Sequence, residues 1–184
     1  MSFHLALQEH QAYLMHLPTL QPAIEAAGQC LLQTFRQGHK LLLCGNGGSA
    51  ADCQHIAAEF VVRYRKVRAA LPAIALTTDT SILTAHPNDF SFDTVFERQV
   101  AALGQTGDCL LAISTSGNSP NIIAAVQQAR RQHLHTIVLS GHEGGRLAGM
   151  AEHDIIIPGS VTARIQEMHI LIAHWWCEQV EQGL

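Results

Sequence analysis

Two short segments rich in serine and glycine have the composition of phosphate-binding loops. They are residues 45–49 (Gly-Asn-Gly-Gly-Ser) and residues 114–119 (Ser-Thr-Ser-Gly-Asn-Ser), and each stands between an apolar run and a helical pattern. A helix N-terminus offers unpaired backbone N–H groups and a partial positive charge, so it binds phosphate without many cationic side chains. Gly117 would let the backbone approach an anion closely. Four hydroxyl groups of the second segment could donate to phosphate oxygens: Ser114, Thr115, Ser116 and Ser119.

The alternative for the second segment is an ordinary turn in which Ser119 only caps the following helix. Three consecutive hydroxyl residues just beyond an apolar run favour phosphate binding over that alternative. The first segment is less specific for phosphate. It lacks the Lys-Ser/Thr pair of a Walker A loop and the spaced glycines of a dinucleotide-binding fold, so nucleotide binding is disfavoured.

Histidine and glutamate side chains at helical spacing form a second candidate group. His55 and Glu59 are four residues apart, so on a helix they share one face and could reach one cation. A solvated His–Glu pair is the alternative, because the chain contains twelve histidines. The C-terminal helical pattern adds Gln166, Glu167, His169 and His174 among apolar residues. Gln166 and His174 would lie about 12 Å apart along a helix. To ligate the same ion, both side chains would have to extend towards a point between them. Otherwise one of them contributes to a site across a subunit interface.

A frame of alternating strands and helices must position these residues. Uninterrupted apolar runs are typical of strands buried on both faces. The predicted strands are residues 41–44, 73–77, 109–113, 136–139 and 154–157, and the predicted helices between and after them are 49–64, 91–103, 120–131, 145–151 and 163–182. This alternation predicts a doubly wound α/β fold with a parallel five-stranded sheet flanked by helices.

The segment before this frame is predicted to be helical, and Pro18 and Pro22 favour two helices over one. No linker or low-complexity tract divides the chain. We therefore expect one domain over residues 1–184, with an N-terminal helical extension (1–37) followed by the α/β core and a C-terminal helix (38–184).

Composition and charge narrow the class of protein. Lys and Arg number 11 against 15 Asp and Glu, so the net charge is −4 and no basic stripe is available for direct nucleic-acid binding. The one cationic cluster, residues 63–68, is either a solvated helix end or a contact for an anionic ligand or partner.

The five cysteines include no CxxC pair, and they are expected to be buried and reduced. Because neither a signal peptide nor a membrane span is recognisable, a cytoplasmic protein without membrane association is expected.

Six stretches of the chain together match one known family, although each alone is weak. They are residues 44–49 (CGNGGS), 54–60 (QHIAAEF), 71–76 (LPAIAL), 88–89 (ND), 113–119 (ISTSGNS) and 164–169 (RIQEMH). On these stretches the chain resembles the sugar isomerase (SIS) domain proteins and, within them, the phosphoheptose isomerases. The resemblance covers about residues 40–180, and the N-terminal helices more loosely.

The resemblance implies the SIS fold and an isomerisation of sedoheptulose 7-phosphate to D-glycero-D-manno-heptose 7-phosphate, the entry step to lipopolysaccharide heptose. It implies one zinc ion per active site, held by His55, Glu59, Gln166 and His174. Glu59 and His174 would be the proton-transfer pair of an enediol mechanism. The residues implied to hold the substrate are Asn46, Gly47, Ser49, Asp89, Ser114, Thr115, Ser116, Ser119 and Gln166.

The resemblance also implies a homotetramer with active sites at subunit interfaces, formed through the N- and C-terminal helices. A charged fraction of only 14% agrees with a surface covered in part by partner subunits. Two departures from the family pattern bear on these expectations. His86 and Pro87 precede Asn88 and Asp89 where small residues are usual, which weakens the expected role of Asp89. The N-terminal extension is also short, which leaves the details of oligomer packing open.

Two non-catalytic interpretations compete with an enzyme. One is an SIS-fold binding protein that associates with the bacterial replication initiator, and the other is a regulatory module that senses a sugar phosphate. A member that has lost catalysis is expected to lack part of the acid–base set. The presence of His55, Glu59 and His174 together therefore favours the isomerase.

Overall fold

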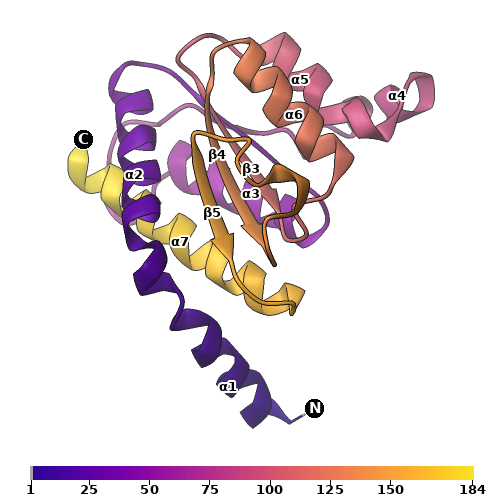
Figure 1. Cartoon of the computed structure of the whole chain (residues 1–184). Coiled ribbons are helices and arrows are strands. Elements are labelled where there is room, and N and C mark those ends of the chain that lie inside the picture. Colours follow the sequence, from indigo (N-terminus) through magenta and orange to yellow (C-terminus); the bar gives the residue numbers. More distant parts are fainter. Residues whose placement is uncertain (1) are drawn as a thin grey trace.

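The computed structural model describes residues 2–184, and its five parallel strands form a sheet covered by helices on both faces (Figure 1). The strand order is β2-β1-β3-β4-β5, and every neighbouring pair is parallel. This is the doubly wound α/β fold that the alternation of strands and helices predicts. In chain order the elements are α1 (Phe3–Leu14), α2 (Leu17–Arg36), β1 (Leu41–Gly45), α3 (Gly48–Val61), β2 (Ala73–Ala75), α4 (Thr80–Asp89), the 3₁₀ helix η1 (Phe92–Thr94), α5 (Val95–Leu103), β3 (Cys109–Ser114), α6 (Pro120–Arg131), β4 (His135–Gly141), the 3₁₀ helix η2 (Gly145–Leu147), β5 (His153–Ile157) and α7 (Thr162–Gly183).

The apolar runs of the strands divide between two cores. In β1, Leu41 and Leu43 belong to the core beneath α2, α3 and α7, whereas Leu42 and Cys44 belong to the core beneath α5 and α6. Successive residues of a strand point to opposite faces, so a strand buried on both faces needs an apolar residue at every position. The burial of all of β1 and β3 follows from this arrangement.

Local chemistry explains where the elements differ from expectation. The N-terminal segment forms two helices, as predicted, but the break lies at Met15 and His16. Pro22 lies inside α2 without ending it, at the cost of one backbone hydrogen bond. Between β4 and β5 the predicted helix is only the 3₁₀ turn η2, because Gly144 and Gly145 adopt positive φ angles of 84° and 55°.

Helices α3 and α7 lie side by side on one face of the sheet and run in the same direction. At their N-terminal ends, a Cβ atom on Gly48 would come within 2.5 Å of Nε2 of Gln166. Seven residues further along α3 and eight further along α7, Nε2 of His55 lies 3.5 Å from Nε2 of His174. The nearly equal steps show that the two helices keep their register, so residues at matching heights face each other.

The N-terminal helix α1 extends from the body of the molecule along α7 (Figure 1). Several of its apolar side chains are exposed: Phe3, Leu5, Leu7 and Leu14. Within residues 2–184, none of the helices has both the length and the apolar character that crossing a membrane requires.

His169 fastens α7 to the sheet from a fully buried position. Its Nε2 donates a hydrogen bond of 2.9 Å to the carbonyl oxygen of Ser140 in β4, whereas its Nδ1 has no partner. Burial lowers the pKa of His169 to about 4, and the hydrogen bond to Ser140 only partly opposes this shift. Protonation would therefore place an unpaired charge in the core.

Replacement of His169 by glutamine is expected to reduce the loss of stability on acidification. The pKa of His169 is lower in the folded chain than in the unfolded chain, so its contribution is fully present above about pH 6.5 and is lost as the pH falls towards 4. Between those limits the wild-type free energy of unfolding should fall by up to about 3 kcal/mol more than that of His169→Gln. Urea unfolding at a series of pH values measures this difference. Parallel curves for the two proteins would show that His169 is not the titrating group.

Candidate active site

The two Ser/Gly segments meet where the strand order changes direction. β2 lies on one side of β1 and β3 on the other, and in doubly wound sheets a ligand binds outside the carboxyl ends of the strands at this point. Gly45 pairs with Ile113, so the loops after β1 and β3 start at the same level of the sheet. Between them is a hollow of about 250 Å³, the loop pocket, lined by Asn46, Gly47, Ser49, Ile113, Ser114, Thr115, Ser119, Thr162 and Gln166.

Helix N-termini and free hydroxyl groups make the loop pocket suited to an anion. α3 begins at Gly48 and α6 at Pro120, so the unpaired N–H groups of two first turns are close to it. Ser119 occupies the N-cap position of α6, but its side chain makes no capping hydrogen bond. Its Oγ instead lies 3.2 Å from Oγ of Ser114. One of these hydroxyl groups donates to the other, so the second keeps its O–H for a phosphate oxygen, in agreement with the phosphate interpretation of this loop.

A pair of asparagines joins the first loop to α6. The side-chain amides of Asn46 and Asn121 donate to each other's oxygens, with both hydrogen bonds at 2.9 Å. Asn121 is 2% exposed, so the pair fixes Asn46 at the mouth of the loop pocket. Each amide keeps a second N–H and a second lone pair, so Asn46 can still contact a ligand. Asn121 was not predicted from the sequence, where it shows only as a polar residue in the first turn of an amphipathic helix.

The second loop is also packed against the segment after β4. Gly117 has φ of 65°, and a Cβ atom there would lie 1.9 Å from the carbonyl oxygen of Gly144. The backbone N–H of Leu147 donates to the carbonyl of Gly117. Ser116 does not line the loop pocket. It lies at a separate hollow of about 750 Å³, together with Asn118, His142, Glu143, Gly145, Pro158, Gly159 and Ser160.

Further along the paired helices, three side chains form what we call the acid–base cluster: His55, Glu59 and His174. Nε2 of His55 lies 3.3 Å from Oε1 of Glu59 and 3.5 Å from Nε2 of His174. The step from Gly48 to His55 corresponds to about 10 Å along α3, and the step from Gln166 to His174 to about 12 Å along α7. The cluster therefore stands about 10–12 Å from the loop pocket along the same two helices.

The environment of His174 favours its neutral form. Burial, aided by the charge of nearby His55, lowers the pKa of His174 and outweighs the opposite effect of Glu59. The ring of Tyr64 stacks on the imidazole, with a centroid separation of 5.6 Å and an interplanar angle of 22°. A neutral, oriented imidazole can ligate a metal ion or exchange a proton.

A buried glutamate holds the segment that carries Tyr64. The carboxylate of Glu181 in α7 accepts hydrogen bonds from the backbone N–H groups of Tyr64, Arg65 and Lys66. Burial alone would raise the pKa of Glu181, but these three hydrogen bonds and the charge of Arg68 together lower it. Arg68 also donates to the last carbonyls of α3, those of Glu59 and Phe60. The cationic segment 63–68 thus lies beyond the end of α3 at Val61, where intrachain contacts hold it. Neither Tyr64 nor Glu181 had been singled out from the sequence.

The acid–base cluster contains nitrogen and oxygen donors of the kind that bind zinc. Its distances from Nε2 of His55 to Glu59 and to His174 are also close to those between two ligands of one zinc ion. With Zn–N and Zn–O bonds of about 2.0–2.1 Å, neighbouring donors of a tetrahedral ion lie about 3.3 Å apart, close to both distances at His55. Gln166 lies at the loop pocket rather than with the cluster. Among residues 2–184, only Cys30, Glu152 and His153 bring three His, Cys, Asp or Glu donors all within 4.8 Å of one another.

Asp89 lies apart from both groups. It is an exposed residue at the end of α4, and its Oδ1 accepts a hydrogen bond from Nδ2 of Asn88. α4 packs against α5 and η1 and projects from the molecule on the side away from α7 (Figure 1). The ring of His86 stacks on Phe90 and forms a hydrogen bond with Thr94. The region around α4 thus accommodates His86 and Pro87, which replace the small residues usual in the family.

Comparison with known proteins shows the family to which the fold belongs. The SIS domain family model matches residues 7–141. The chain belongs to the SIS domain family. A phosphoheptose isomerase of Roseiflexus is 54% identical over 168 residues, which are 91% of this chain and 85% of that protein. One from Campylobacter jejuni is 49% identical over 96% of this chain and 95% of its own length.

Solved structures of phosphoheptose isomerases also resemble this chain. The phosphoheptose isomerase of Neisseria gonorrhoeae superimposes with a TM-score of 0.89 at 45% identity, and that of Francisella tularensis with 0.92 at 37% identity. In both cases the match covers 97% of this chain and 95% of the other. Within the SIS domain family the chain therefore groups with the phosphoheptose isomerases, and these relatives give no support to the alternative of a replication-initiator partner.

Proposed function

We propose that the chain is an aldose–ketose isomerase that converts sedoheptulose 7-phosphate to D-glycero-D-manno-heptose 7-phosphate. The observation that carries this proposal is the separation of about 10–12 Å between the loop pocket and the acid–base cluster. From ordinary single-bond lengths of about 1.5 Å, an extended seven-carbon sugar with a terminal phosphate spans roughly 9–10 Å. A phosphate on C7 in the loop pocket thus brings C1 and C2 to the acid–base cluster.

Proton transfer between C1 and C2 suits the residues of the acid–base cluster. A base removes a proton from C1 of the ketose, an enediol forms, and a proton returned to C2 leaves the aldehyde at C1. Glu59 is the proposed base: Oε1 faces His55, and the other carboxylate oxygen is left to take the proton. With Nε2 of His174 facing His55, its other ring nitrogen, Nδ1, is left to exchange protons with the substrate oxygens.

The proposed cofactor is one zinc ion held by His55, Glu59 and His174, with Gln166 as the fourth ligand expected from the family. The nitrogen and oxygen donors and the distances at His55 support this assignment. Bound there, zinc would polarise the carbonyl and hydroxyl oxygens of the substrate. Gln166 lies at the start of α7, so its contribution to the ion requires its side chain to turn along the helix or to come from a neighbouring subunit.

The proposed assembly is a homotetramer with the active sites at subunit interfaces. An apolar groove between the N-terminal helices and α7 supports it, because Leu14, Met15, Leu171 and Trp175 are exposed there. Asp89 does not line the loop pocket of its own chain, so its role in the site requires the α4 of another subunit.

Metal removal tests the proposed function. The zinc-loaded protein is expected to convert sedoheptulose 7-phosphate, and dialysis against a chelator should lower the rate at least about a hundredfold, with recovery on adding zinc. Product formation is followed by chromatography, and the fold is checked by circular dichroism. No turnover by folded, zinc-loaded tetramer would overturn the isomerase. Full turnover after complete removal of metal would overturn the cofactor and leave the isomerase standing.

A further inference from the structure

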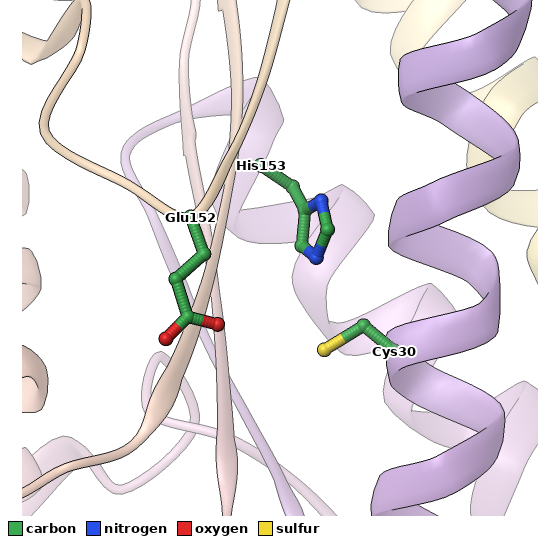
Figure 2. A group of neighbouring side chains, drawn as sticks. All are labelled: Cys30, Glu152 and His153. Carbon is green, nitrogen blue, oxygen red and sulfur yellow. The ribbon is translucent and has the colours of Figure 1, made fainter.

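A second group of metal-binding side chains lies where α2 passes the edge strand β5 (Figure 2). Cys30 comes from the middle of α2, Glu152 precedes β5, and His153 is the first residue of β5. Their donor atoms all lie within 4.8 Å of one another. Figure 2 shows the thiol, the carboxylate and the imidazole projecting into one space between the helix and the strand.

Neighbouring residues hold these donors in place. Oε2 of Glu152 accepts a hydrogen bond of 2.9 Å from Nδ1 of His135, the first residue of β4. The backbone N–H of Glu152 donates to Oγ1 of Thr136. Hydrogen bonds of this kind orient the ligands of protein metal sites. The group lines a hollow of about 410 Å³ open to solvent, so an ion has a route to it.

The thiol of Cys30 differs from the other four in its surroundings. Cys44, Cys53, Cys109 and Cys177 are buried, whereas Cys30 is partly exposed. The neighbouring Cys109 thiol lowers the pKa of Cys30 and outweighs the effect of burial; the charge of His135 lowers it further, whereas the charge of Glu152 opposes it. The thiolate is the form that ligates metals. A thiolate beside the Glu152 carboxylate also places two negative groups together, which a cation would neutralise.

We propose that Cys30, Glu152 and His153 bind a zinc ion, with water at the remaining position. One thiolate, one imidazole and one carboxylate are all zinc ligands, and the sulfur disfavours magnesium and calcium, which prefer oxygen. The ion joins the N-terminal helical segment to the edge of the sheet, so its effect is on stability. This site goes beyond the proposed isomerase and shares no residue with it.

Cobalt distinguishes this site from the acid–base cluster, because only this site contains sulfur. Metal-free full-length protein loaded with Co²⁺ alone is expected to show a near-ultraviolet thiolate-to-cobalt absorption band. The band should persist in Cys53→Ala, a matched thiol control, and in the double variant His55→Asn/His174→Asn. It should disappear in Cys30→Ala, and His153→Asn should weaken Co²⁺ binding at this site at least about tenfold. A band that survives Cys30→Ala, or its absence from folded wild type, would overturn the proposal.

The shift in thermal unfolding midpoint on adding zinc is a second test of this site. It uses variants that keep Cys30, so it can be applied even if Cys30→Ala does not fold. In the His55→Asn/His174→Asn background, zinc at about a hundred times its Kd should raise the midpoint by about 5–10 °C. Adding His153→Asn should abolish that shift. An equal shift with His153→Asn would mean that the ion binds elsewhere. Neither result depends on isomerase activity, so failure here and failure of the proposed function remain distinguishable.

Discussion

Glu59→Gln is expected to lower kcat for sedoheptulose 7-phosphate about 10³-fold while the phosphate end of the substrate still binds. Glutamine keeps the size of the side chain and its oxygen towards His55, but it cannot accept a proton. General-base catalysis contributes about 10²–10⁴-fold to enzyme rates, and this substitution removes it. KM is expected to change less than about threefold, because the loop pocket is formed by other residues. Steady-state kinetics give both values.

Two controls separate loss of the base from other effects. Glu97→Gln changes a glutamate on α5 that pairs with Arg131 and lines neither the loop pocket nor the apolar groove, and it should leave turnover unchanged. Zinc content is measured in Glu59→Gln, so that loss of the ion is recognised separately. Turnover within about tenfold of wild type in folded Glu59→Gln would remove Glu59 from the role of base.

Gly117→Ala is expected to have the largest effect on stability and on the phosphate loop. Residue 117 has φ of 65°, which costs a residue with a Cβ about 1–2 kcal/mol. The new methyl group would also lie 1.9 Å from the carbonyl oxygen of Gly144, and relieving that clash adds about 1–3 kcal/mol. The sum is about 3 kcal/mol, or roughly 6–12 °C in Tm for a chain of this size. Because the loop must move, KM for the sugar phosphate should also rise at least about tenfold.

Gly149→Ala is the matched control for this prediction. Gly149 also has positive φ, 74°, but no atom lies within 4 Å of where its Cβ would be. Only the backbone cost of about 1–2 kcal/mol applies, so Tm should fall by roughly 2–8 °C and KM should not change. Equal losses of Tm in the two variants would show that the contact between Gly117 and Gly144 has no effect on stability.

The sheet and its helices could be predicted from the sequence because burial on both faces leaves a simple pattern. The apolar runs at β1 and β3 extend over whole strands, and Pro120 marks the start of α6. Prediction was poorer where single glycines decide the geometry, as at η2, or where a proline is tolerated inside a helix, as at Pro22 in α2. Such outcomes depend on tertiary packing rather than on local preference.

The residues expected to contact the substrate could be predicted from the sequence, whereas the residues that support them could not. The composition of the two loops and the helical spacing of His55 and Glu59 led to their prediction. Three residues that support them are recognised only through their neighbours in space: Asn121 through Asn46, Tyr64 through His174, and Glu181 through the backbone of residues 64–66. Ser116 was grouped with its neighbours by sequence, yet the turn at Gly117 directs it to another hollow.

Isomerisation in deuterium oxide tests whether the loop pocket and the acid–base cluster work together as an isomerase site. Zinc-loaded protein is expected to convert sedoheptulose 7-phosphate to an aldose phosphate, and the protein-bound enediol is expected to take a deuteron on C2, which NMR detects in the product. Over the same time, Glu59→Gln is expected to yield no detectable product and no deuterated ketose. If the folded, zinc-loaded wild type leaves sedoheptulose 7-phosphate unchanged, the loop pocket and the acid–base cluster do not form an isomerase site.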